Sequence, residues 1–182
     1  MKTLSIYWKT AALFIGMIFF AASVSNAQSS KDKRIINDSR SARTEFLKGD
    51  KLMQTLFDNS YGYVVFPNMG KGGAGIGAAA GSGIVYEKGE MIGSAKMKQL
   101  NVGAQLGGQA YREVIFFENK AALNRFRDNK FEFAAQTSAV AVKEGVSANA
   151  SYRDGVMVFT QEKAGLMYEA SLGGQKFSYT SF

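Results

Sequence analysis

The sequence predicts an α+β protein. We expect a mostly antiparallel, glycine-rich sheet, arranged as a sandwich or as a barrel-like sheet, with a long N-terminal amphipathic helix and one short helix. Thirteen of the 20 glycines lie between Tyr61 and Glu118, where they alternate with alanine, isoleucine and valine at the period of two that strands have. The residues before this region repeat apolar positions at steps of three and four, which predicts the helix.

The first 27 residues differ in composition from the rest. Lys2 and Lys9 precede an apolar run from Ala11 to Ala22, and Ser25-Asn26-Ala27 supplies the small residues that a signal peptidase recognises. The run is shorter than the about 20 apolar residues that span a bilayer. We therefore expect a signal peptide at residues 1–27 and an exported, periplasmic or secreted protein that can associate with a membrane.

Residues 28–34 are small, polar and charged, and we expect a flexible spacer there. A single domain is predicted for residues 35–182. It begins with an amphipathic helix from Ile35 to Phe57, which the polar residues 58–60 end. Ser39, Ala42 and Gly49 lie in its apolar stripe, and these small residues predict close packing on the glycine face of the sheet.

Short turn-bounded runs predict the strands. The first runs from Tyr61 to Phe66, and Pro67 is expected to end it. Asn119 is expected to cap the short helix, with Leu123 and Phe126 facing inward. Further strands are predicted at residues 72–86, 91–97, 102–117, 131–142, 147–152, 156–160, 165–172 and 177–179.

The chain contains no histidine and no cysteine. This composition excludes disulfides, the usual zinc, copper and haem ligand sets, and the Ser-His-Asp and Cys-His arrangements that activate nucleophiles. The acidic residues are scattered, and no pair is spaced for acid–base catalysis. We expect a non-enzymatic protein with no metal or cofactor, although carboxylate-only metal sites and lysine chemistry stay formally open.

Two short motifs match enzyme patterns outside their required context. Residues 75–80 satisfy the loose dinucleotide pattern GxGxx(G/A), but the segment continues as a strand where a helix is needed. Ser30 and Lys33 have the spacing of a penicillin-recognising nucleophile, but they lie in the predicted spacer. Neither motif predicts a catalytic or nucleotide site.

The formal net charge is +7, and it falls to +5 without the two lysines of the first 27 residues. A basic surface favours anionic partners, either phospholipid headgroups or nucleic acid, and the expected export disfavours nucleic acid. The basic residues before and on the first helix allow contact with an anionic membrane. Mixed charges along that helix favour instead a core-packed helix with a solvated outer side.

Three blocks of the sequence resemble the SYLF domain family. They are YGYVVFPNMGKGG (residues 61–73), VGAQLGGQAYREVIFFEN (102–119) and GLMYEASLGGQKF (165–177), and they occur in the family's order. The resemblance covers about residues 35–182. It implies a lipid-binding module of the phosphoinositide or anionic-phospholipid type, which yeast relatives also use to bind actin.

The family's membrane-binding region is basic and N-terminal, so the resemblance maps it by position and character onto this chain. The candidate lipid-binding residues are Lys31, Lys33, Arg34, Arg40, Arg43 and Lys71. Actin is an unexpected partner because of the export signal, and because Met91-Ile92-Gly93 stands where relatives often have a tryptophan and proline. The resemblance implies binding to an anionic membrane surface. The alternative is a soluble periplasmic carrier or scaffold for an apolar ligand or a protein.

Overall fold

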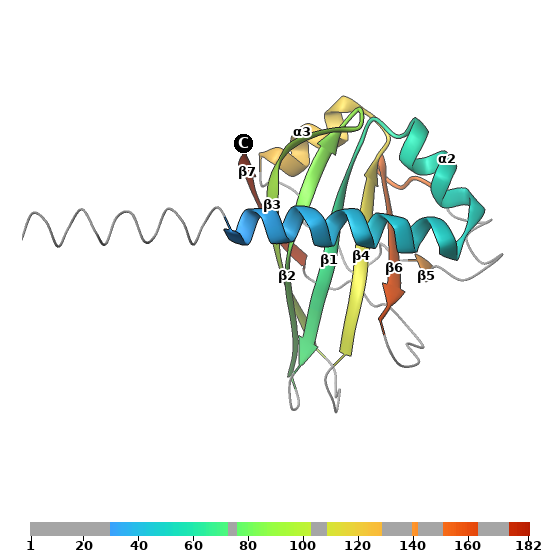
Figure 1. The fold of residues 1–182 in the computed structure, drawn as a ribbon. Coiled ribbons are helices and arrows are strands. Elements are labelled where there is room, and N and C mark those ends of the chain that lie inside the picture. Colours follow the sequence, from blue (N-terminus) through green and yellow to red (C-terminus); the bar gives the residue numbers. More distant parts are fainter. Residues whose placement is uncertain (1–29, 73–75, 103–108, 129–139, 142–150, 164–174) are drawn as a thin grey trace, which may run out of the picture. The chain divides into compact units, whose positions relative to one another are not determined.

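The computed structural model describes residues 30–72, 76–102, 109–128, 140–141, 151–163 and 175–182. The chain divides into two units, Met1–Arg34 and Ile35–Phe182. Of the first unit only residues 30–34 are described. They are helical, although the sequence predicts a flexible spacer there. The sheet in Figure 1 belongs to the second unit.

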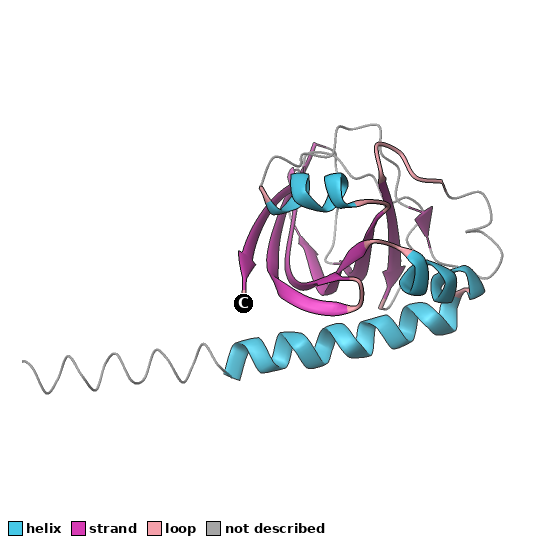
Figure 2. Cartoon of the chain, turned by 90° about the horizontal axis from the view of Figure 1, so that it is seen from above, coloured by secondary structure: helices cyan, strands magenta, loops and turns pink. Residues whose placement is uncertain are grey.

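Seven strands form this sheet in the order β5-β6-β4-β1-β2-β3-β7, and every neighbouring pair is antiparallel except β5 with β6. The α+β class with a mostly antiparallel sheet is therefore confirmed. Figure 2 shows one curved sheet, whose strand order is open, with β5 and β7 at its two edges. The described strands do not close into a barrel, and they form no second sheet. The bounds are β1 Gly62–Gly72, β2 Ile76–Glu87, β3 Glu90–Val102, β4 Gln109–Phe117, β5 Val140–Ala141, β6 Val156–Glu162 and β7 Gln175–Ser181.

The two faces of the sheet carry separate hydrophobic cores, because successive side chains of a strand point to opposite faces. Val65 and Phe116 pack against the first helix and α2 (Lys51–Asn59), on what we call the outer face. Their neighbours Val64 and Phe117 pack around α3 (Lys120–Arg127), on the inner face. Figure 2 shows the sheet curving around this inner face.

The prediction of one helix from Ile35 to Phe57 is wrong at Asp50. Residues 35–49, the first helix, and α2 are separate helices. Asp50 is extended, and its carboxylate accepts the Leu52 N–H at 2.7 Å. This is the N-cap contact that satisfies a free donor of a new helix, so Asp50 begins α2 instead of continuing the first helix.

The close packing expected between the first helix and the glycine face is also wrong. Gly83 lies on the inner face with Val85, away from the first helix. A Cβ at Gly83 would lie 2.4 Å from the Val65 carbonyl oxygen and 2.8 Å from the Phe66 ring. Because Gly83 has no side chain, β1 and the Phe66 ring can approach β2 closely at this position. The small residues of the first helix instead approach β1, where Ser39 Oγ donates to the Val65 carbonyl oxygen at 3.3 Å.

Pro67 does not end the first strand as predicted, because β1 continues through it to Gly72. The register of β1 is irregular there, between Phe66 and Met69 on the β4 side and between Val65 and Gly70 on the β2 side. Proline lacks an N–H for the ladder, and an irregularity of this kind removes the need for one.

The strands predicted at residues 156–160 and 177–179 are confirmed in β6 and β7. The strand predicted at 72–86 is confirmed from Ile76 onward in β2, whereas Gly72 ends β1. Of the strand predicted for 102–117, residues 109–117 are confirmed in β4 and Val102 belongs to β3, while residues 103–108 lie outside the described residues. The strand predicted at 91–97 therefore extends further than expected. Ser151 and Tyr152 are not in a strand. Residues 131–139, 142, 147–150 and 165–172, for which strands are also predicted, lie outside the described residues.

Asn119 caps α3 as predicted. Its side-chain oxygen accepts the Ala122 N–H at 3.0 Å. Leu123 and Phe126 are fully buried in the inner core, which confirms that they face inward.

Candidate functional site

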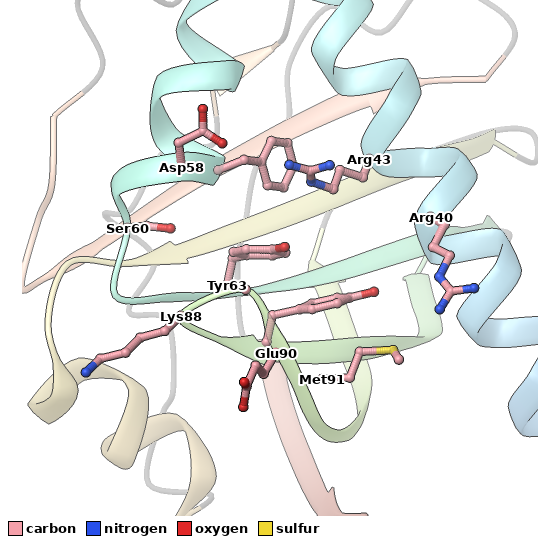
Figure 3. Close-up of a pocket in the computed structure, with 11 residues that line it drawn as sticks. Arg40, Arg43, Asp58, Ser60, Tyr63, Lys88, Glu90 and Met91 are labelled. Atoms are coloured by element: carbon pink, nitrogen blue, oxygen red, sulfur yellow. The ribbon is translucent and has the colours of Figure 1, made fainter.

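A cleft of about 830 Å³ lies where the first helix and the end of α2 meet the β2–β3 hairpin (Figure 3). It combines aromatic, basic and acidic side chains. Its charged residues are Arg40, Arg43, Lys88, Asp58 and Glu90. The cleft belongs to the second unit, and two of the predicted lipid-binding residues line it.

Two stacked tyrosines line the cleft. Tyr63 of β1 and Tyr86 of β2 are direct cross-strand partners, and their ring centroids are 4.7 Å apart at an interplanar angle of 20°. Side chains at such paired positions are close enough to interact. Phe57 of α2 meets Tyr63 edge-on, with centroids 5.0 Å apart. The position of these rings depends on strand register and on the start of α2 at Asp50.

Arg40 and Arg43 reach the cleft together because residues three apart share one side of a helix. The Arg43 guanidinium lies 4.9 Å from the centroid of the Phe57 ring, a cation–π distance that holds it in place. The Arg43 Nε is buried, and no described residue accepts its hydrogen bond.

The tyrosine hydroxyl groups add neutral donors. Burial raises the pKa of Tyr63, and the nearby Arg43 guanidinium partly opposes the rise. Burial also raises the pKa of Tyr86, with a further rise from Tyr63. Both phenols are therefore protonated at neutral pH. In Figure 3 the Tyr63 hydroxyl points toward the side where Arg40 and Arg43 lie.

The charges of the cleft are unevenly placed. Lys88 and Glu90 are exposed on the β2–β3 hairpin and point away from the arginines in Figure 3. Lys88 Nζ lies 5.5 Å from the centroid of the Tyr61 ring. The Asp58 carboxylate accepts a hydrogen bond from Gln54 at 2.6 Å. We call the region of Arg40, Arg43 and Tyr63 the arginine end, and its side chains are hydrogen-bond donors suited to an anion.

None of the other predicted site residues is among the residues that line the cleft. Lys71 lies in β1, in register with Ala79 and Gln109, eight positions beyond Tyr63 and thus roughly 26 Å along the strand. Lys31, Lys33 and Arg34 are exposed helical residues of the first unit.

Lys88, Tyr63 and Tyr86 line the cleft but are not among the residues predicted for the site. The turn from Glu87 to Glu90 can be recognised in the sequence, and it could have placed Lys88 on a hairpin. The tyrosine pair depends on the β1–β2 register, for which the sequence carries no local signal.

In the part of the chain that the structure describes, no three Asp or Glu side chains gather into a group that could hold a metal ion. In the same residues no helix combines the length and apolarity needed to cross a bilayer.

Comparisons with known proteins identify relatives. Residues 98–181 match the model of the Ysc84 family, described as Las17-binding protein actin regulator. The protein named beta cell expansion factor A of Aeromonas veronii is 32% identical over 123 residues, which make up 67% of this chain and 47% of that protein. The matched part of the chain thus spans about half the length of this relative.

Proposed function

Because the chain belongs to the SYLF domain family that the Ysc84 model describes, we propose that it is a non-enzymatic cell-envelope protein that binds anionic phospholipid. Family membership supports a domain type that binds lipid or actin. The export signal expected in residues 1–27 favours lipid, since an exported protein meets phospholipid surfaces and rarely meets actin or nucleic acid.

The arginine end of the cleft is the observation that carries the proposal. Arg40, Arg43 and Tyr63 bring two guanidinium groups and a protonated phenol to one side of the cleft. Guanidinium groups match the geometry of phosphate oxygens and bind them with charge-assisted hydrogen bonds. A phospholipid headgroup, of the phosphoinositide type or another anionic type, is the ligand that fits this donor set.

Long-range attraction supplements this contact. Lys31, Lys33 and Arg34 are exposed, and each basic residue near an anionic membrane contributes about 1 kcal/mol. In this proposal the basic residues attract the protein to the surface, and the arginine end holds a phosphate.

The test is cosedimentation of the purified full chain with anionic and with zwitterionic vesicles, at low and at high salt. We expect salt-sensitive binding to anionic vesicles only. The double variant Arg40→Gln/Arg43→Gln should bind roughly 30-fold more weakly, since it loses about 2 kcal/mol. Equal binding of both vesicle types, or salt-insensitive binding, contradicts the electrostatic mechanism.

The matched control is Lys51→Gln/Lys120→Gln, which removes two exposed charges outside the cleft. It should lose much less affinity than the arginine variant. Because Arg43 also packs on Phe57, thermal unfolding must show that the arginine variant is folded. Tyr63→Phe, which removes only a hydroxyl group, gives a second and milder test.

A soluble carrier or scaffold is the alternative. If the protein binds neither vesicle type, and native mass spectrometry detects a copurifying apolar ligand or protein, this alternative replaces the lipid proposal.

A further inference from the structure

The outer face of β3 and β7 is basic. Lys98 pairs with Lys176 across the two strands. Two residues further along, on the same face, Lys96 pairs with Ser178. All four of these side chains are exposed. From Met91 to Val102, and throughout β7, the sequence contains no acidic residue. These two strands therefore present three exposed lysines on one face.

The first helix and α2 pack against the other strands on the outer face of the sheet. The outer core that they form includes residues of β1, β2, β4 and β6 but none of β3 or β7. Ala95 and Met97, which alternate with the lysines, are buried in the inner core instead. The lysine side chains of β3 and β7 therefore project from the outer face of the sheet.

An apolar pair lies at one end of this basic strip. Met91 and Phe182 are the large hydrophobic residues that the described part of the chain exposes, with 39% and 64% of their surface accessible. They are close to one another, because the Phe182 N–H donates to the carbonyl oxygen of Ile92 at 3.2 Å. Two such residues side by side mark a contact surface more strongly than scattered ones do.

The apolar pair connects the strip to the cleft. Met91 lines the cleft together with Arg40, as Figure 3 shows. Lysines, apolar side chains and the arginine end therefore follow one another over adjacent elements of the same unit.

We propose that the outer face of β3 and β7, with Met91 and Phe182 at its end, is the surface that lies on an anionic phospholipid bilayer. The inference rests on the proposed function and adds the orientation of the domain. The lysines contact headgroup phosphates, while Met91 and Phe182 enter the boundary between headgroups and acyl chains, as interfacial apolar residues do. This orientation directs the arginine end toward the same headgroups.

Lysines on edge strands can also discourage pairing between copies of a sheet. That role does not require exposed apolar residues beside them. It also predicts no change in the surroundings of Met91 when the protein binds vesicles, so an experiment separates the two explanations.

Single cysteines can report the orientation, because the chain has none of its own. Met91→Cys and Phe182→Cys would carry a polarity-sensitive fluorophore, with Thr55→Cys on α2 and Asn124→Cys on α3 as exposed controls. With anionic vesicles, the labels at 91 and 182 should shift to the blue and be quenched by nitroxide-bearing lipids. The labels at 55 and 124 should not change. Vesicle binding without a change at 91 and 182 overturns the orientation and leaves the proposed function intact.

The lysine strip gives a second test. In the triple variant Lys96→Gln/Lys98→Gln/Lys176→Gln, vesicle affinity should fall on the order of 100-fold, from about fivefold per lysine. The control Lys48→Gln/Lys51→Gln/Lys120→Gln removes the same charge from exposed positions elsewhere and should lose only a few-fold. Equal losses in the two variants contradict the inference. If the unmodified protein binds no vesicles, the proposed function itself fails.

Discussion

The Gln175 side chain donates through Nε2 to both carboxyl oxygens of Glu113, at 3.3 and 3.2 Å, inside the inner face of the sheet. The same Nε2 lies 3.0 Å from Gln99 Oε1. All three side chains are buried. Burial raises the pKa of Glu113 to about 8, and the hydrogen bond from Gln175 only partly opposes the rise. The carboxyl group is therefore mostly protonated at neutral pH.

This relationship predicts a stability that falls as pH rises. The pKa of Glu113 is higher in the folded than in the unfolded protein, so its contribution is complete below about pH 4.5 and is lost as pH rises through about 8. We expect urea unfolding to give a free energy of unfolding lower at pH 8 than at pH 5, by a few kcal/mol.

Glu113→Gln is the matched variant, since it keeps the shape and cannot ionise. It should have a smaller pH dependence than the unmodified protein and should be the more stable of the two at pH 8. Identical pH profiles would show that Glu113 does not titrate in this range.

Glycine at position 83 is predicted to be required by packing. In Gly83→Ala the new Cβ meets the Val65 carbonyl oxygen at 2.4 Å, and backbone cannot move aside as a side chain can. We expect a loss of about 1–3 kcal/mol in the free energy of unfolding. Gly70→Ala is the control, because a Cβ there has no atom within 4 Å, and it should be neutral or slightly stabilising.

Removal of the α3 cap should lower stability. Asn119→Ala leaves the Ala122 N–H without its acceptor, at a cost of about 1 kcal/mol. In thermal unfolding this corresponds to a fall in Tm of about 2–4 °C for a chain of this size. Asn124→Ala, an exposed position within α3, should not lower Tm, and equal effects of the two variants would contradict the capping role.

Charge reversal before the first helix should weaken vesicle binding. Lys31→Glu/Lys33→Glu/Arg34→Glu replaces attraction to anionic headgroups with repulsion. The effect should shrink as salt rises, because the screening length falls from about 8 Å at physiological ionic strength to about 3 Å at 1 M. Cosedimentation at the two ionic strengths measures this. If the variant binds like the unmodified protein at low salt, these residues do not attract the membrane.

Local patterns in the sequence were enough for the fold class, most strands around the glycine-rich region and the α3 cap. Alternation and capping depend on residues a few positions apart, so one segment contains the whole signal. Arg40 and Arg43 became candidate site residues through the family resemblance, and their spacing of three residues places them on one side of the helix. Asp50 shows the limit, because a capping residue inside a periodic segment was taken as part of the helix.

The features of the fold and of the cleft that local patterns did not predict depend on contacts between distant segments. The Tyr63–Tyr86 stack requires the β1–β2 register, and the Glu113–Gln175 contact joins residues 62 positions apart. The sheet face of Gly83, the passage of β1 through Pro67 and the lysine strip on β3 and β7 likewise depend on which strands become neighbours. A period of two shows that two faces exist, but only the packing of the helices against one of them determines which face is buried beneath them and which lysines remain exposed.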